Sequence, residues 1–136
     1  MNKLPTDVVV LECIYGLYAE AFRHFPKEQS DRSAKIYVPI DVGAVASKLK
    51  TDAHELFGRL YYDLDHRYRY KQDDGSLVHL FAFKVGDDRH CINYPYLAGV
   101  LAEKRAEGKR NKWSLWLSLL SLGIALAALV TQAAGS

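Results

Sequence analysis

A short run in which cations alternate with tyrosines is the segment best suited to bind a charged partner. In residues 67–71, RYRYK, a positive side chain occupies every second position. Successive side chains of a β-strand point to opposite faces, so a strand here would place all three cations together. Guanidinium and ammonium groups gathered in this way bind phosphates or carboxylates. The run is therefore a candidate contact surface for a nucleic acid or a protein.

The residues before this run add a second set of contact groups. Between Asp52 and His66, apolar residues recur at helical spacing and predict an inner face: Leu56, Phe57, Leu60, Tyr61 and Leu64. The opposite face of this predicted helix carries Arg59, Tyr62 and His66. Arginine and tyrosine are enriched among residues that carry most of the binding energy at interfaces. The complete set of predicted binding residues is Arg59, Tyr62, His66, Arg67, Arg69 and Lys71.

The balance of charges argues against tight binding to DNA. Residues 50–71 hold five basic and four acidic side chains, far from the strongly basic footprint of a tight DNA-binding domain. The predicted turns at Asp73-Asp74 and Asp87-Asp88 are acidic and would repel phosphates. A monomer should therefore bind nucleic acid weakly, and dimerisation or membrane tethering would compensate by raising the effective concentration.

The other reactive residues show no arrangement typical of an enzyme. The five histidines lack a metal-ligand spacing such as HExxH, and the chain has neither a Gly-rich phosphate loop nor a Ser-centred nucleophile elbow. His54 beside Glu55 is interpreted as a solvated helix face, and His90 as a turn residue next to the buried thiol of Cys91. Cys13 and Cys91 are predicted to be free thiols. We expect no catalytic residue, no metal and no cofactor.

The first half of the chain predicts three helices and one short strand. Apolar residues at three- and four-residue spacing indicate a helix over 7–25, which Pro26 ends, and a polar loop over 27–35 follows. Residues 36–38 are β-branched or aromatic and indicate a short or edge strand, because Pro39 closes it. Two helices at 41–50 and 52–66, capped by Asp41 and Asp52, form a helix-turn-helix pattern.

A hairpin and a last helix are predicted next. Asp74-Gly75 is a strong turn signal that should join a strand at 67–71 to one within 77–84. Gly86-Asp87-Asp88 indicates another turn, followed by a short strand at 91–94. Pro95 suits the first turn of a helix over 96–107, which Gly108 and Asn111 should interrupt.

The C-terminal segment is predicted to cross a membrane. The last 24 residues carry no charge, and residues 113–134 form a helix of about 33 Å, close to the thickness of the bilayer hydrocarbon. Trp113 and Trp116 suit the membrane interface, and a basic collar precedes the span: Lys104, Arg105, Lys109, Arg110 and Lys112. By the positive-inside rule the N-terminal side is cytoplasmic and the C-terminus lies across the membrane. The lipid bilayer is thus the first predicted partner.

A stripe of small residues runs along this span. Its members recur at alternating spacings of four and three residues: Ser114, Ser118, Ser121, Ala125 and Ala128. Small side chains let membrane helices approach closely, which favours a homodimer or a membrane partner through this face.

The order helix, short strand, helix, helix, hairpin, helix over residues 7–107 resembles the winged helix-turn-helix superfamily. The resemblance implies an α+β fold in which, where members bind DNA, the second helix of the pair enters the major groove and the hairpin touches the backbone. Bacterial membrane-tethered transcription regulators combine such a cytoplasmic domain with one span. In this chain only a handful of residues follow the span, so sensing by an external domain is not expected.

These observations predict four segments and leave two functions open. The segments are a winged-helix-like domain over 1–107, a basic juxtamembrane linker over 108–112, a transmembrane helix over 113–134 and a short tail at 135–136. The first function is nucleic-acid binding by a membrane-anchored winged helix, as a regulator. The alternative is a membrane-tethered adaptor that binds a protein through the same surface.

Overall fold

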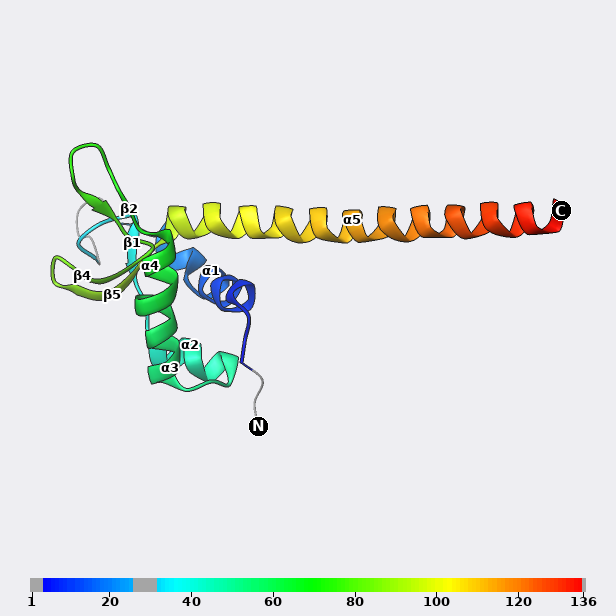
Figure 1. Ribbon diagram of the computed structural model, residues 1–136. Coiled ribbons are helices and arrows are strands. Elements are labelled where there is room, and N and C mark those ends of the chain that lie inside the picture. The colour runs from blue at the N-terminus through cyan, green and yellow to red at the C-terminus, as the bar shows by residue number, and fades with distance from the viewer. Residues whose placement is uncertain (1–3, 26–31, 136) are drawn as a thin grey trace. The chain divides into compact units, whose positions relative to one another are not determined.

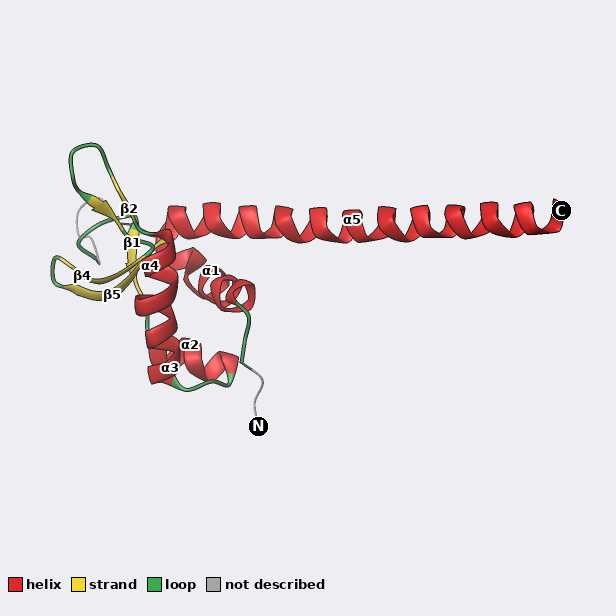
Figure 2. Ribbon diagram, in the orientation of Figure 1, coloured by secondary structure: helices red, strands yellow, loops and turns green. Residues whose placement is uncertain are grey.

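The computed structural model describes residues 4–25 and 32–135, and the chain divides into two units, Met1–Leu101 and Ala102–Ser136. The first unit is α+β, and the second continues the last helix of the first (Figures 1 and 2). Residues 26–31 of the predicted loop and Ser136 of the predicted tail lie outside the described residues.

Side chains with the expected capping chemistry start the first three helices. Helix α1 (Asp7–Arg23) begins where the Thr6 hydroxyl accepts a hydrogen bond from the Val9 N–H. Helix α2 (Val42–Leu49) is capped by Asp41, and helix α3 (Ala53–Gly58) by Asp52, as predicted. A carboxylate at these positions satisfies amide groups that have no partner inside the helix.

Helix α3 continues without a break through a wider turn. A π-helical segment, η1 (Arg59–Leu64), leads into a last short helix, α4 (Asp65–Tyr68). Inside η1 the Asp65 N–H bonds to the Leu60 carbonyl, five residues back rather than four. The predicted helix at 52–66 is therefore present, but it extends to Tyr68.

Three antiparallel strands form the main sheet. Strands β1 (Tyr37–Pro39), β4 (Phe81–Val85) and β5 (Asp88–Asn93) lie in the order β1-β5-β4. Ile92 of the central strand pairs with Val38 on one side and Phe81 on the other. Gly86 turns the chain between β4 and β5 with a φ of 58°, a left-handed conformation that glycine adopts without strain. Pro39 lies on an edge strand, as predicted.

The predicted hairpin from 67–71 to 77–84 is wrong in its extent. Only β2 (Tyr70–Lys71) and β3 (Leu77–Val78) pair around Gly75, while Arg67 belongs to α4. Strand β4 pairs with β5 instead. The β2–β3 pairing ends because the buried carboxylate of Asp65 accepts the N–H groups of Leu80 and Phe81, at 2.9 and 3.1 Å. These two bonds fix the start of β4.

The core lies between the sheet and the helices. Side chains with less than 2% exposure come from every layer: Val10, Leu11, Ile14, Val38, Leu56, Leu60, Leu64, Leu80, Phe81, Ile92, Leu97 and Leu101. The last two belong to the start of helix α5 (Tyr94–Gly135). Two tyrosine hydroxyls also hold the first turn of α5 against the domain. Tyr94 donates to the Tyr15 carbonyl, and Tyr96 donates to the Tyr68 carbonyl.

Helix α5 is longer than predicted. It runs through Gly108 and Asn111, where an interruption was expected. One glycine inside a helix costs only about 1 kcal/mol, which good helix formers on either side offset. Within the described part of the chain, α5 is the one helix long and apolar enough to cross a membrane, and none of its most apolar stretch is buried.

Removal of the Asp65 carboxylate should destabilise the first unit. Asp65→Ala leaves two buried amides without an acceptor, which should lower the free energy of unfolding by about 3 kcal/mol. Urea unfolding of the 1–107 fragment measures this change. The exposed Asp73→Ala is the matched control and should stay within about 0.5 kcal/mol of the parent. Equal stability of the two variants would contradict the role given to Asp65.

Candidate functional site

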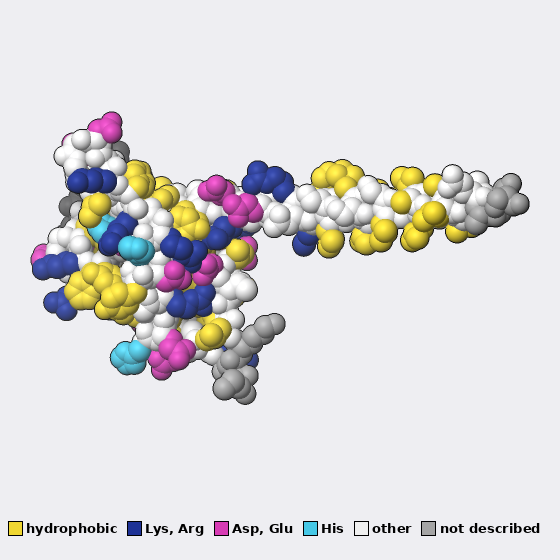
Figure 3. All heavy atoms as spheres, in the orientation of Figure 1, with side chains coloured by type: hydrophobic (Ala, Val, Ile, Leu, Met, Phe, Trp, Pro, Cys, Tyr) yellow, Lys and Arg dark blue, Asp and Glu magenta, His cyan; other side chains and the backbone are white. Residues whose placement is uncertain are grey.

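A connected group of aromatic rings lies between the α3–η1 helix and the β4–β5 hairpin. We call it the ring surface and define it as Phe57, Tyr61, Tyr62, Phe83 and His90. Neighbouring ring centroids are 5.0 to 6.3 Å apart. Tyr62 is 72% exposed, Phe83 45% and Tyr61 38%. Figure 3 shows hydrophobic side chains gathered at this place. Large exposed rings in contact are typical of a binding surface.

The π-helical turn explains how the helix side of this surface arises. Leu60 and Leu64 are fully buried, whereas Tyr61 and Tyr62 both emerge to solvent. The sequence pattern predicts Tyr61 on the inner face, and the extra residue in the wide turn changes that placement. Such turns occur frequently at functional sites.

His90 forms the hairpin side of the ring surface. Its ring lies 5.3 Å from Phe57 and 5.5 Å from Phe83, between centroids. The backbone of His90 has a φ of 55°, in the left-handed region, while its carbonyl accepts the Ile40 N–H. A non-glycine residue is strained there, and such strain persists only where the surroundings hold it. The prediction of a turn residue is thus corrected to a strand residue in β5.

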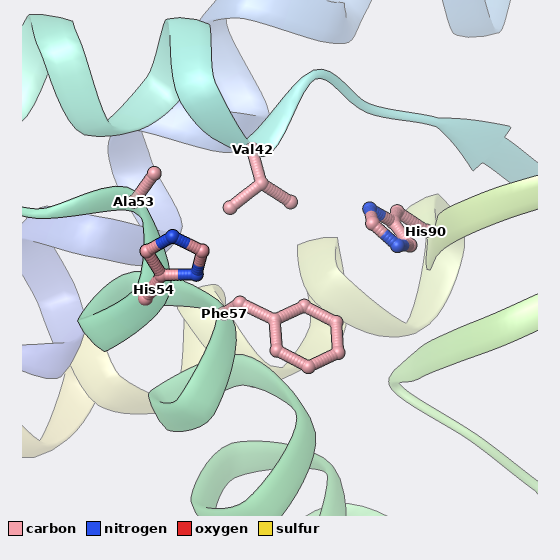
Figure 4. A pocket seen from close by; sticks show the side chains of 5 residues that line it. All are labelled: Val42, Ala53, His54, Phe57 and His90. Atoms are coloured by element: carbon pink, nitrogen blue, oxygen red, sulfur yellow. The ribbon is translucent and has the colours of Figure 1, made fainter.

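A pocket of about 300 Å³ opens beside the ring surface. Its lining consists of Val42, Ala53, His54, Phe57 and His90. The two imidazoles face the space from opposite sides, with the Phe57 ring between them (Figure 4). Phe57 and His90 belong to both features, so the pocket and the ring surface form one continuous site.

Two of the predicted cations are engaged within the protein. The Asp7 carboxylate receives Arg59 Nη2 on one oxygen and Arg67 Nη2 on the other, both at 2.7 Å. Arg59 also donates to the Pro5 carbonyl, and Arg67 Nε lies 2.9 Å from Asp63. These contacts fix the start of α1 against η1 and α4. They also pair two arginines that the sequence predicts as nucleic-acid or partner contacts.

The same contacts shift the pKa values of Asp7 and Arg67. Burial alone would raise the pKa of Asp7, but hydrogen bonds from Arg67 and Arg59 outweigh it and hold that pKa below its ordinary value. Hydrogen bonds to Asp63 and then to Asp7 raise the pKa of Arg67. Arg67 is therefore charged but already paired, and Arg59 lies against the same Asp7 carboxylate.

The remaining predicted residues are His66, Arg69 and Lys71. Arg69 Nη2 lies 3.1 Å from His66 Nδ1, just after α4 ends, and Lys71 lies on β2. All three are exposed. Of the six predicted binding residues, only Tyr62 belongs to the ring surface.

His79 and Asp65 form a histidine–carboxylate pair, at 3.0 Å, of a kind that also orients catalytic histidines. Here the other oxygen of Asp65 is occupied by the amides of Leu80 and Phe81, so the pair fixes the chain at the start of β4. Among the described residues, no group of three His, Cys, Asp or Glu side chains could hold a metal ion.

Both cysteines are free thiols, as predicted. Cys91 is fully buried, and burial followed by the charge of Asp88 raises its pKa to about 11. Its thiol therefore stays protonated and unreactive at neutral pH.

Sequence reasoning missed most of the ring surface. Phe57 was assigned to the inner face of its helix and does pack against the core, and Tyr61 was assigned to the same face. Phe83 was placed in a predicted strand and His90 in a turn. The alternation of Phe81, Ala82 and Phe83 does place both phenylalanines on one face, but only the fold shows that Phe83 lies beyond the covered part of that face.

No protein-family model, curated protein or solved structure matches the chain. What the protein binds is therefore inferred from the chemistry of its own surface.

Loss of the Asp7 carboxylate should destabilise the first unit in a pH-dependent way. The folded pKa of Asp7 lies below its unfolded value of about 3.8, so its contribution is present above that pH and disappears as the pH falls through the folded value. Asp7→Asn should cost about 1 kcal/mol at pH 7, because the partners are partly exposed, and less at pH 2. Urea unfolding of the 1–107 fragment at both pH values measures the difference. Asp73→Asn should show no comparable pH dependence, and a cost for Asp7→Asn that is the same at both pH values would contradict the assignment.

Proposed function

We propose that this protein is a membrane-anchored winged-helix adaptor that binds a protein partner through its ring surface. The observation that carries the proposal is the contrast between two neighbouring groups. Tyr61, Tyr62 and Phe83 of the ring surface are exposed, whereas Arg59 and Arg67 are held by Asp7 and Asp63. An exposed set of tyrosine and phenylalanine rings is typical of the energetically dominant part of a protein interface.

The topology supports the winged-helix part of the proposal. A helix, a short strand and two helices lead into the β4–β5 hairpin, and the central strand of the sheet is the last one. The helix formed by α3, η1 and α4 contacts β4, an arrangement that fits a recognition helix beside a wing. The small β2–β3 ladder is an addition between them.

The long apolar helix supports the anchor. Residues 113–134 contain no charge, and five cations lie in residues 103–112. This distribution favours a cytoplasmic N-terminal domain with the C-terminus across the membrane. Tethering confines the domain to one surface, so that a weak contact can suffice.

Reporter fusions test this orientation in cells. A periplasmic or luminal reporter fused after Ser136 should be active, and a cytoplasmic reporter at the same place inactive. Replacing Lys109, Arg110 and Lys112 by Asn should lower the fraction of chains in this orientation, because these charges favour a cytoplasmic position of the basic collar. A cytoplasmic reporter that is active at the C-terminus, or a protein found in the soluble fraction, would contradict the orientation.

Site-specific photo-crosslinking tests the adaptor proposal. A photoreactive phenylalanine at position 62 of the full-length chain should form one discrete protein adduct, since Tyr62 is the most exposed ring of the surface. The same group at Asp73, on the β2–β3 turn, is the control and should form none. Tyr61→Ala should reduce the adduct at least fivefold, because a truncated ring in a binding centre costs over about 1 kcal/mol. An adduct that forms equally at both positions would argue against a specific surface.

Nucleic-acid binding remains a second candidate, favoured by one feature of the hairpin. Lys84 and Arg89 lie opposite each other on β4 and β5, where the wing of a DNA-binding member contacts the backbone. Two phosphate contacts predict that log K falls by about 1.8 per decade of salt. A dimerised 1–107 fragment, tested with duplex and single strands, should show this slope only if the second candidate is correct, and Lys84→Ala with Arg89→Ala should then abolish it.

A further inference from the structure

We propose that one face of helix α5, at the start of the span, binds the headgroups of acidic phospholipids. The face consists of four residues at spacings of four, three and four: Arg105, Lys109, Lys112 and Trp116. We call it the basic stripe. The inference goes beyond the ring surface and rests only on the membrane anchor of the proposed function.

The basic stripe exists because α5 is continuous. The helix runs without a break over Tyr94–Gly135, through Gly108 and Asn111 (Figure 1). At about 100° per residue, the four side chains of the stripe leave the helix within about 60° of one another. A break at Gly108 or Asn111 would have separated the rotation of the first cations from that of the span. The unbroken helix thus keeps the cations in line with Trp116.

The acidic residues of the same segment lie on the other side of the helix. Glu103 and Glu107 are about 150° to 190° away from the centre of the basic stripe. The positive-inside rule depends on how many cations flank a span, not on the face that they occupy, so it does not explain this separation. A phosphate that approaches the basic stripe meets cations and no carboxylate, as in an anion-binding face.

The two lysines of the basic stripe are available to a ligand. Lys109 and Lys112 are exposed, and within the described part of the chain neither takes part in an ion pair. Trp116 is 54% exposed, and its indole N–H can donate a hydrogen bond at a membrane interface. The stripe therefore suits an anion that lies beside an apolar phase.

The place of the stripe along α5 identifies this anion as a lipid headgroup. Lys112 directly precedes Trp113, where the predicted span begins, and Lys109 lies about 6 Å before Trp113 along the axis. The headgroup layer on each side of the hydrocarbon is roughly 5–8 Å thick, so both lysines fall within it. Cations at this depth attract acidic lipids, by a factor of about five for each Lys or Arg. A nucleic acid or a protein segment would first have to displace those headgroups.

Pairing of two helices would leave the basic stripe open to lipid. The small-residue stripe, from Ser114 to Ala128, lies on the same side of α5 as Glu103 and Glu107. Two chains joined through it would turn their basic stripes outward.

The tryptophans of the protein report on the lipid beside the stripe. Trp113 and Trp116 are the two tryptophans of the sequence, so the tryptophan fluorescence of the full-length chain comes from the start of the span. The chain is reconstituted in phosphatidylcholine vesicles with a minor fraction of phosphatidylglycerol brominated in its acyl chains. Parallel vesicles contain the same fraction of brominated phosphatidylcholine. Bromine quenches a neighbouring tryptophan, and we expect the acidic lipid to bind beside the tryptophans about fivefold more tightly, or more.

Two charge exchanges separate the face from the number of charges. Glu107→Lys with Lys109→Glu removes a cation from the basic stripe and should lower the preference for phosphatidylglycerol about fivefold. Glu107→Arg with Arg110→Glu moves a cation between two positions off the stripe and should change the preference less than about twofold. Both variants keep the five cations of residues 103–112, so the orientation that depends on their number is unchanged.

Four results would overturn the inference. Equal quenching by the two brominated lipids would show no preference, while leaving the anchor in place. Equal effects of the two exchanges would show attraction by net charge alone. Tryptophan emission that responds to an oligothymidylate, without excess quenching by phosphatidylglycerol, would assign the stripe to nucleic acid. The absence of quenching by either lipid would refute the membrane anchor as well.

Discussion

The buried carboxylate of Asp65 is the interaction on which the arrangement of the site depends. Its side chain is 2% exposed, and it accepts the Leu80 and Phe81 amides and contacts His79 Nδ1. A buried charge is tolerated only when its hydrogen bonds are complete, so the start of β4 must lie where it does. Because Asp65 follows η1 directly, this constraint holds the hairpin against the same helix that carries Tyr61 and Tyr62.

The buried guanidinium of Arg32 joins the end of α1 to the segment before β1. Arg32 is 4% exposed, and its guanidinium donates to the carbonyls of Ala21 and Phe22 at the end of α1 and to that of Lys35 before β1. The last carbonyls of a helix lack partners inside it and carry partial negative charge, which a guanidinium satisfies well. Arg32 thus replaces the glycine cap that often ends a helix. Its bond to the Lys35 carbonyl also fixes the residues that precede β1, the edge strand of the sheet.

The sequence predicted correctly those features that depend on neighbouring residues alone, such as helix caps and turns. Asp41 and Asp52 were found as caps because an N-cap bond lies within three residues of the acid. Gly86 was found as a turn because of its neighbours, and the apolar span was found from composition alone. The placement of Arg67 was missed because its helical state depends on Asp63, one turn back, and on Asp7, sixty residues away. Strict alternation suggested a strand, and tertiary contacts overrode it.

The candidate site was missed for the same reason. Nothing near His90 in the sequence indicates a left-handed backbone, and the π-helical turn at Arg59–Leu64 has no local signature. Both depend on packing between segments some thirty residues apart. The cations were visible in the sequence, but their neutralisation by Asp7 was not. The sequence therefore showed neither that Asp7 pairs with two of these cations nor that the neighbouring rings are exposed.

A tether changes what this surface needs to achieve. A few exposed rings give modest affinity, because association must offset lost translational and rotational freedom. Confinement at a membrane lowers this cost when the partner is confined to the same membrane, since their association then becomes nearly intramolecular. The small-residue stripe of the span, from Ser114 to Ala128, would add to this effect if it pairs two chains, by presenting two ring surfaces at once. With the proposed anchor, an aromatic surface of this size suffices, whereas a freely diffusing protein would need a larger interface.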